Sequence, residues 1–539
     1  MQMEVDRPSA LFPIKCWIFT DLLLHAYIEI PTVTIGGVLK EKRISSLTSG
    51  TIILRMRSMA KEEKLSLKVW VDNGKKRAVF GEASDDFIDI VFSFLTLPLG
   101  NIVKLLSKNS GMGSIDNLYD SIEKLGGQYW RTEACKNMLL SPLNAARKYC
   151  EDLKLNVDDE INPRELYLFK MDSCISGSKC YFSSVRDSRC HCCGELMDKV
   201  GLWEKVQTIE DGVFVKKNSV KFIITDNFLV KSVSVLHYYD ILKEFGVEDL
   251  FLIEERTLKF GRKELLDLLK KFVEGNGVLT KICFPDLCIR RSTAIYNDEI
   301  EMKIFESKNN TRLETKKLHI KLIINRINNN VVCAELGEEF ADQLFSFLTF
   351  PLGLVLELIG CSKSLGCMTN LYNSIQELNF NYFKSEEAKN MLISPQLAPF
   401  FGHNKQMLNI NIKIPALGEL KNGCRKCYRD DKKVPCSTTC EHGVHQSYYK
   451  ESDPKLAQSD KDLNGGFVRW PQIFLVTDDL HVTPMYLSSF KQILTSQGLH
   501  VDHLEKKEIT IGRAQVSALL KAMLISKRTL SDALSPYDK

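Results

Sequence analysis

The chain has 539 residues, of which 44% are hydrophobic and 26% charged, an ordinary composition for a globular protein. Its 72 basic and 68 acidic residues give a formal net charge of +4. This near balance gives no strong signal for nucleic acid or an anionic membrane surface, and no uninterrupted apolar run is long enough to span a bilayer.

Residues 1–58 have no counterpart elsewhere in the chain. Their most apolar stretch, residues 16–24, contains Asp21 and lacks both the basic start and the small-residue cleavage site of a secretory signal. We therefore expect residues 1–58 to be an extension outside the folded core, with a targeting segment as the alternative.

A β-hairpin followed by helices is predicted next. Apolar residues alternate over 65–71, and Asn73-Gly74 is a pair preferred in two-residue hairpin turns, where φ is positive. Helical spacing of apolar residues follows over 87–94, 99–106 and 118–125. Pro98 suits the start of the second helix because proline has no N–H to lose there.

Strands and helices alternate further along the chain. Residues 220–225 form a largely apolar run, and helices are expected at about 231–245 and 262–274 with a short strand between them. This alternation favours a small α/β module with a partly parallel sheet.

The second half of the chain repeats the first at a constant offset of 253 residues. The matching blocks are 92–100, 117–122 and 136–142 in the first half and 345–353, 370–375 and 389–395 in the second. The second hairpin is expected at 320–332 with its turn at 328–330, and the last helices at about 486–497 and 513–526. Such self-similarity predicts a duplicated architecture.

The predicted fold class is therefore α/β (mixed α+β) and internally duplicated, each half combining a β-hairpin with helices, a cysteine-rich knuckle and a small strand–helix module. The first half comprises a hairpin–helix module at 64–170, a cysteine cluster at 171–200, an α/β module at 213–282 and a linker at 283–314. The second comprises a hairpin–helix module at 315–415, a cysteine cluster at 420–442, a polar linker at 443–466 and an α/β module at 467–534.

Two cysteine clusters are candidate structural zinc sites, one ion in each. Their predicted ligands are Cys424, Cys427, Cys436 and Cys440 in the second half, and Cys174, Cys180, Cys190 and Cys193 in the first. Four thiolates complete a tetrahedral zinc site and leave no position for a catalytic water. Cys192 could replace Cys193, and a loop of redox-labile thiols is the alternative.

The total of 17 cysteines is odd, and no secretory signal is apparent, so a disulfide framework is not favoured. We expect an intracellular, reducing location, cytoplasmic or nuclear.

Recurring carboxylates are the other candidate site residues. Glu82, Asp86 and Asp89 in the first half correspond to Glu335, Glu339 and Asp342 in the second. Such acids can act in acid–base chemistry or bind a cation, but at a strand-to-helix junction we favour complementing a helix N-terminus. Asp226 and Asp478 end strands and are interpreted as helix N-caps. No phosphate loop, nucleophile elbow or metalloprotease motif is present, so the sequence gives no positive evidence for an enzyme.

The sequence resembles the plant proteins grouped as domain of unknown function 674. The resemblance is carried by the hairpin, by Leu97-Pro98-Leu99-Gly100 and Asn117-Leu118-Tyr119, and by the cysteine cluster that follows them. The resemblance covers roughly residues 64–539, and the same set recurs in the second half. It implies a plant source and a tandem layout, and it implies no activity, ligand or catalytic residue.

The favoured hypothesis is a non-catalytic interaction or scaffold protein with zinc knuckles and an unidentified protein partner. The alternative is a small-molecule binder or enzyme with its site between the halves or at the strand ends. A weaker alternative is nucleic-acid binding through basic residues beside the second cluster. Those residues are Arg425, Lys426, Arg429, Lys432 and Lys433.

Overall fold

The computed structural model describes a defined part of the chain. The described residues are 64–158, 165–168, 180–190, 193–202, 212–217, 221–287, 317–360, 365–403, 405–408, 410, 449–456 and 465–534. The chain divides into two compact units, Met1–Lys61 and Glu62–Lys539. The expected extension, residues 1–58, belongs to the first unit and lies outside the described residues.

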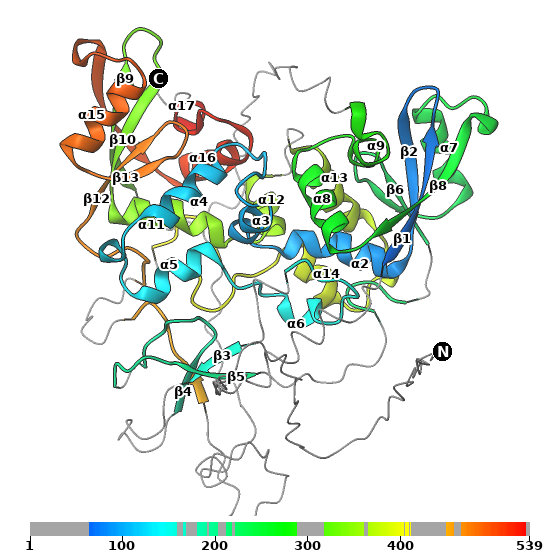
Figure 1. The fold of residues 1–539 in the computed structure, drawn as a ribbon, viewed down its shortest axis with the longest axis horizontal. Helices are drawn as coiled ribbons and strands as arrows, with labels where there is room; N and C mark the ends of the chain where they lie inside the picture. Colours follow the sequence, from blue (N-terminus) through cyan, green and yellow to red (C-terminus); the bar gives the residue numbers. More distant parts are fainter. Residues whose placement is uncertain are drawn as a thin grey trace, which may run out of the picture. The chain divides into compact units, whose positions relative to one another are not determined.

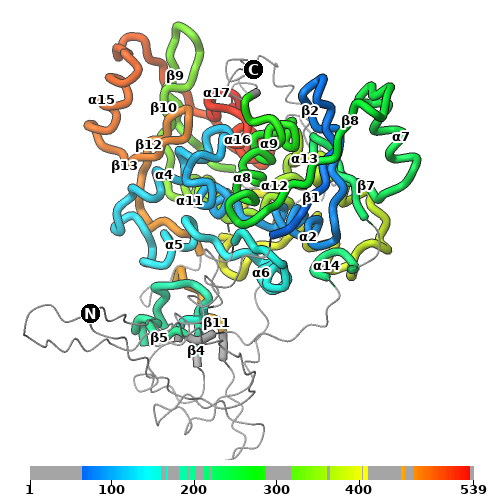
Figure 2. The backbone as a smooth tube through the Cα atoms, turned by 45° about the vertical axis from the view of Figure 1, so that its right-hand side comes forward, coloured from blue at the N-terminus to red at the C-terminus, as the bar shows by residue number. Residues whose placement is uncertain are grey.

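Two five-stranded sheets organise the second unit, and Figures 1 and 2 show them on opposite sides of it with helices between. The first sheet has the order β7-β6-β2-β1-β8, and the second has the order β13-β12-β10-β9-β14. The strands of the first are β1 (Leu65–Asp72), β2 (Arg77–Ala83), β6 (Phe222–Thr225), β7 (Val230–Ser232) and β8 (Ile253–Phe260). Those of the second are β9 (Leu318–Asn325), β10 (Val331–Gly337), β12 (Ile473–Thr477), β13 (Val482–Pro484) and β14 (Leu504–Ile511).

The predicted mixed α/β fold is confirmed, but the partly parallel sheet is wrong. Every pairing within the two five-stranded sheets is antiparallel. The strands expected to form a separate module instead extend the hairpin: β6 pairs with β2 and β8 with β1. Both hairpin edges expose unpaired N–H and C=O groups, and the later strands satisfy them.

The predicted hairpins are confirmed, although the first turn differs from the two-residue type. Four residues, 73–76, separate β1 from β2, and the positive φ of 50° falls at Lys76. The side chain of Asp72 accepts the Lys75 N–H at 2.9 Å and so closes this longer turn. In the second hairpin Asn329 has the positive φ, as expected for asparagine.

Most of the described helices fill the space between the two sheets, while Val235–Glu244 and Leu487–Ser496 each pack on the outer face of one sheet. Those of the first half are α2 (Asp85–Ser93), α3 (Leu99–Leu105), α4 (Ile115–Lys124), α5 (Glu133–Leu140), α6 (Arg147–Cys150), α7 (Val235–Glu244), α8 (Arg262–Val273) and α9 (Val278–Cys283). Those of the second half are α11 (Glu338–Ser346), α12 (Leu352–Ile359), α13 (Cys367–Glu377), α14 (Glu386–Ile393), α15 (Leu487–Ser496), α16 (Arg513–Ile525) and α17 (Thr529–Leu534). In the described part of the chain, no helix is both long and apolar enough to cross a membrane.

A third, smaller sheet joins strands from both halves in the order β11-β4-β3-β5. Its strands are β3 (Glu165–Leu168), β4 (Cys180–Ser183), β5 (Lys199–Leu202) and β11 (Tyr449–Glu451), and β11 pairs with β4 in parallel. Of the first cysteine cluster, residues 180–183 and 199–200 lie in strands of this sheet, while the second cluster and most of the expected linkers lie outside the described residues.

The halves share one hydrophobic core and exchange contacts reciprocally. Leu99 donates its N–H to the Phe350 carbonyl and Leu352 to the Leu97 carbonyl, both at 2.9 Å. α4 of the first half contacts β13 of the second, and α13 of the second contacts β7 of the first. A helix from each half therefore packs against a strand of the other half's sheet.

Candidate functional site

Two recurring carboxylates, Asp89 and Asp342, are buried at equivalent places and hold backbone. Asp89 accepts the N–H groups of residues 213–215, each at 2.9 Å. Asp342 accepts the N–H groups of Phe467 and Val468 at 2.7 and 2.9 Å. In both halves the carboxylate fixes the segment that leads into the sheet strand β6 or β12.

Burial raises the pKa of Asp89 to about 6, although its three N–H donors lower it. Burial likewise raises the pKa of Asp342 to about 7 against its two donors. Both acids therefore bind distant backbone N–H groups, and the interpretation that they complement their own helix N-terminus is wrong for these two.

The other recurring acids form separate pairs and do not converge on one cation. The pairs are Glu82 with the Tyr238 hydroxyl (2.8 Å), Asp86 with Lys154 (2.6 Å), Glu335 with Lys321 (2.7 Å) and Glu339 with Lys405. Within the described ranges, no three His, Cys, Asp or Glu residues gather as they would around a metal ion.

The strand-end acids do cap helices, but not the helices that follow them directly. Asp226 accepts both the N–H and the hydroxyl of Thr280, and Asp478 does the same with Ser531, all at 2.7 Å. Each hydroxyl in turn accepts a backbone N–H from β2 or β10, at 2.8 and 2.9 Å. The acids therefore cap α9 and α17 and tie these last helices to the hairpins.

Two predicted zinc ligands, Cys190 and Cys193, lie on a tight turn. Gly194 donates its N–H to the Cys190 carbonyl at 2.8 Å and has a φ of 73°, which only glycine adopts easily. Cys190 is 1% exposed and packs with Tyr167 and Met197. The side chain of Cys180 and all of Cys174, Cys424, Cys427, Cys436 and Cys440 lie outside the description.

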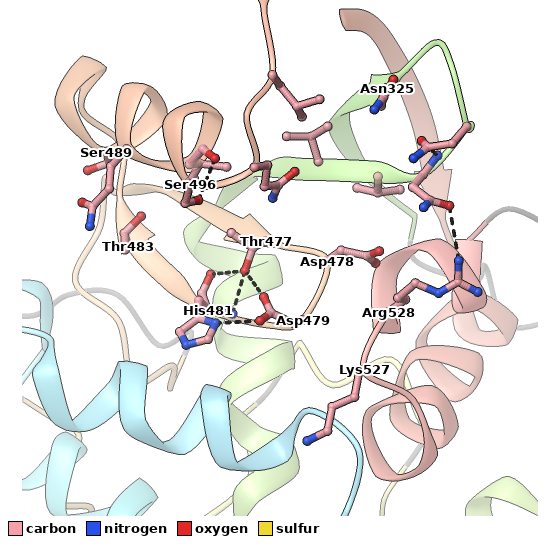
Figure 3. A pocket seen from close by; sticks show the side chains of 18 residues that line it. Asn325, Thr477, Asp478, Asp479, His481, Thr483, Ser489, Ser496, Lys527 and Arg528 are labelled. Atoms are coloured by element: carbon pink, nitrogen blue, oxygen red, sulfur yellow. Dashed lines mark hydrogen bonds and ion pairs between the residues drawn. The ribbon is translucent and has the colours of Figure 1, made fainter. Parts of the chain in front are cut away.

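A pocket of about 650 Å³ opens in the second half, at the end of β12. It is bounded by the β9–β10 hairpin turn, the β12–β13 turn, α15 and the loop before α17 (Figure 3). Its lining is mostly amide and hydroxyl side chains together with charged residues. These side chains include Asn325, Asn328, Asn330, Ser489, Gln492, Ser496, Gln497, Asp479, His481, Lys527 and Arg528.

A hydrogen-bonded pair, Asp479 and His481, sits on the β12–β13 turn (Figure 3). His481 Nδ1 lies 3.1 Å from Asp479 Oδ2, and the Thr477 hydroxyl donates to Asp479 Oδ1 at 2.6 Å. Burial raises the pKa of Asp479, but the donors His481 and Thr477 outweigh it, so the pKa is lowered. The bond to Asp479 raises the pKa of His481. Asn117 of α4 also donates to the Asp479 carbonyl at 2.9 Å, so the first half supports this turn.

The first half has the same turn without these charges. Phe228 and Leu480 adopt φ values of 62° and 65° at equivalent places, offset by 252 residues (480 − 228). Thr280 and Ser531 occupy equivalent positions because each binds the strand-end acid of its half, and matching them aligns the loops before α9 and α17. The first half has Asn227 where the second has Asp479, Leu229 for His481, Asn276 for Lys527 and Gly277 for Arg528.

A family model described as "Protein of unknown function (DUF674)" matches residues 61–514. The chain belongs to this family. Comparison with curated proteins and with solved structures gave no match. Membership confirms the resemblance of the repeated motifs and assigns no activity to this DUF674 protein.

Sequence reasoning missed four of the titratable residues that line the pocket of this DUF674 protein, namely Asp479, His481, Lys527 and Arg528. Its histidines are scattered along the chain, and Lys527 and Arg528 follow a helix with no motif around them. A position-by-position comparison of the two halves would have marked these positions as different, but it would also have marked others, such as Asn328 and Asn330 where the first half has Lys75 and Arg77.

Proposed function

We propose that this protein is a non-catalytic binding protein whose second half holds a small polar molecule in the pocket beside β12. The proposal rests on a difference between the halves in the side chains that surround a shared backbone frame. The supporting frame is present twice, including the strand-end acid and the hydroxyl that it binds. Positions 479, 481, 527 and 528 carry titratable side chains in the second half only, whereas Asn328, Asn330 and Gln492 of the lining stand where the first half has the charged Lys75, Arg77 and Asp240. Side chains that do not serve the shared frame are available for a function specific to that half.

The state of the pocket acids supports binding over acid–base catalysis. Asp478 uses both oxygens on Ser531, and Asp479 accepts from His481 and Thr477. The donors hold the pKa of Asp479 below its usual range, which weakens it as a base, and both oxygens of Asp478 are occupied although burial raises its pKa. The amide and hydroxyl lining supplies the convergent hydrogen-bonding groups of a ligand site, and the pocket volume suits a small organic molecule.

A thermal-shift screen of polar metabolites tests this proposal. The variant D479N/H481L gives the second turn the side chains of the first, which the fold already accommodates there. We expect metabolites that stabilise the wild type to lose their effect on this variant. The matched control N227D/L229H makes the reverse change in the first half and should leave the shifts unchanged. Equal shifts in all three proteins would contradict the assignment.

A second candidate is an interaction module for a protein partner, with its cysteine segments ordered by structural zinc. The turn of Cys190 and Cys193 favours it, because two thiols with two residues between them on a tight turn can share one tetrahedral ion. An ion held by these thiols beside the small sheet would then stabilise a segment with little core of its own.

Metal analysis of the purified protein, with thermal melts before and after chelation, tests this second candidate. We expect zinc in the wild type, less in C190S/C193S, and unchanged zinc in the control C283S, which removes a cysteine outside both clusters. A metal-free protein with freely reactive cluster thiols would contradict it.

A further inference from the structure

We infer that the ligand of this pocket is a neutral polyhydroxyl compound, a sugar or a polyol, bound in the space that side chains of the hairpin close in the first half. This inference rests on the proposed function and specifies the chemistry of its ligand.

In the first half, two cationic side chains tie the hairpin to the end of α7. Arg77, at the start of β2, donates to the Phe245 carbonyl, and its guanidinium lies 5.3 Å from the centroid of the Phe245 ring. Lys75 donates through its ammonium group to the Gly246 carbonyl at 3.1 Å. Asp72 Oδ2 lies 3.7 Å from Arg77 Nε, and Asp72 also accepts the Lys75 N–H. These contacts span the gap between the hairpin turn and the helix.

The second half has shorter or more polar side chains at the same places. Asn328 and Asn330 replace Lys75 and Arg77 at the offset of 253 residues. Gln497 follows α15 where Phe245 follows α7, at an offset of 252 residues. Asparagine is too short to reach across the gap as arginine and lysine do. The gap is therefore open in the second half, and all three replacing residues line the pocket of about 650 Å³.

The end of α15 offers backbone acceptors to a ligand. Among the described residues, no side chain donates to the carbonyl of Gln497 or Gly498, the counterparts of the two carbonyls that Arg77 and Lys75 bind in the first half. Carbonyls at a helix C-terminus lie at the negative pole of the helix dipole. They attract hydrogen-bond donors and disfavour an anion.

A cationic ligand is disfavoured as well. Arg528 Nη1 lies 3.4 Å from Asn330 Oδ1, so a guanidinium already lies beside the residue that replaces Arg77, and a second cation there would be repelled. The carboxylates of Asp478 and Asp479 accept hydrogen bonds from protein donors and leave few acceptor positions for a cation.

The positive side chains do not converge on one anionic group either. Figure 3 shows the charged ends of Lys527, Arg528 and His481 directed away from one another around the pocket. No single point of the lining therefore selects a phosphate or a carboxylate.

Hydroxyl groups suit the rest of the lining. On α15, Gln492 and Ser496 stand where the first half has the charged Asp240 and Glu244. Amide and hydroxyl side chains each offer both a donor and an acceptor, and a ligand hydroxyl group does the same. A molecule with several hydroxyl groups can donate to the carbonyls that follow α15 and accept from the amides without bringing a charge into the pocket.

Isothermal titration of the full-length protein tests the ligand class. The neutral probes are glucose, sucrose and myo-inositol, and the charged counterparts are glucose 6-phosphate and protonated glucosamine. We expect at least one neutral probe to bind, and to bind several-fold more tightly than either charged compound. Failure of all three neutral probes to bind would overturn the inference, and so would a charged compound that binds as tightly as the best neutral one.

The variant N330R/Q497F tests where the ligand lies. It gives the second half the pair that spans the gap in the first, and the fold already accommodates this pair there. The affinity for the neutral probe should fall at least tenfold, because the new side chains occupy the space of the ligand. The control K491F adds the same ring to α15 outside the pocket lining and should bind as the wild type does. Unchanged affinity in N330R/Q497F would overturn the inference, and N330R alone keeps the test if the double variant fails to fold.

The variant D479N/H481L separates the ligand class from the pocket itself. If glucose 6-phosphate binds most tightly and D479N/H481L abolishes its binding, the neutral ligand is wrong and the proposed function stands. If a neutral probe binds equally to the wild type, D479N/H481L and N330R/Q497F, its site lies elsewhere, which contradicts both.

Discussion

At the scale of single residues, equivalent carboxylates hold the backbone in place in both halves. Asp89 and Asp342 hold the segments that enter the sheets, and Asp226 and Asp478 hold the last helices. Carboxylates suit this task because one group can accept several N–H and O–H donors. Their recurrence in the sequence is therefore explained by the backbone groups that they hold in both halves.

The raised pKa of Asp342 predicts a specific dependence of stability on pH. The folded protein retains this proton up to about pH 7, whereas the unfolded chain releases it near the ordinary value of 3.8. The free energy of unfolding should therefore fall as the pH rises through this window, by up to about 4 kcal/mol. D342N has no carboxyl group to titrate at this position. Its free energy of unfolding should therefore rise relative to that of the wild type as the pH rises.

Urea unfolding of the wild type and D342N across this pH range measures the effect. The control D286N removes an exposed carboxylate and should show the same pH dependence as the wild type. A difference between D342N and the wild type that stays constant with pH would contradict the assignment of this titration to Asp342.

At the scale of elements, two helices meet their neighbours too closely for a side chain. A Cβ on Gly353 would lie 2.5 Å from the Leu392 carbonyl oxygen, and one on Gly100 would lie 2.9 Å from the Leu139 oxygen. These contacts join α12 to α14 and α3 to α5 at equivalent places. The repeated Leu-Gly after each proline is explained by this packing.

We expect G353A to destabilise the protein by about 1–3 kcal/mol through overpacking. Glycine to alanine inside a helix ordinarily stabilises it by up to about 1 kcal/mol, so the sign of the change is diagnostic. Chemical denaturation measures it, with G127A as the control because a Cβ there meets nothing within 4 Å. A G353A variant more stable than the wild type would contradict this account, because it would show that α12 and α14 can move apart without loss of stability.

Local elements could be predicted from the sequence, but their partners could not. Hairpin turns and helix starts such as Pro98 depend on residues close in the chain, which is why their positions were found. The pairing of β6 with β2 joins segments far apart in sequence, and no local period encodes it. The pocket was missed for the same reason: Asn330, His481 and Lys527 come from three separate segments.

At the scale of the whole molecule, the halves are interlocked through equivalent asparagines. Asn117 of the first half donates to the Asp479 carbonyl, and Asn370 of the second half donates to the Asn227 carbonyl, both at 2.9 Å. The first half therefore supports the turn that carries the pocket charges. A site in one half depends on a helix from the other.

This dependence predicts different effects of two matched substitutions. N117A removes a donor from the pocket turn, and we expect it to weaken ligand binding by several-fold as well as to reduce stability. N370A removes the same bond from the turn without the charges, and it should reduce stability alone. Titration and thermal melting of both variants compare these effects, and equal affinities would argue against support of the pocket by α4.

The most direct test of the account is the affinity of the best ligand from the metabolite screen for two proteins, the wild type and D479N/H481L/K527N/R528G. The variant carries the first-half side chains at these four of the lining positions and keeps the rest of the second half. Titration calorimetry should show a loss of affinity of about a hundredfold or more, since several hydrogen bonds, some of them charge-assisted, disappear. Equal affinities, with both proteins folded, would place the ligand elsewhere and contradict the assignment of function to this pocket.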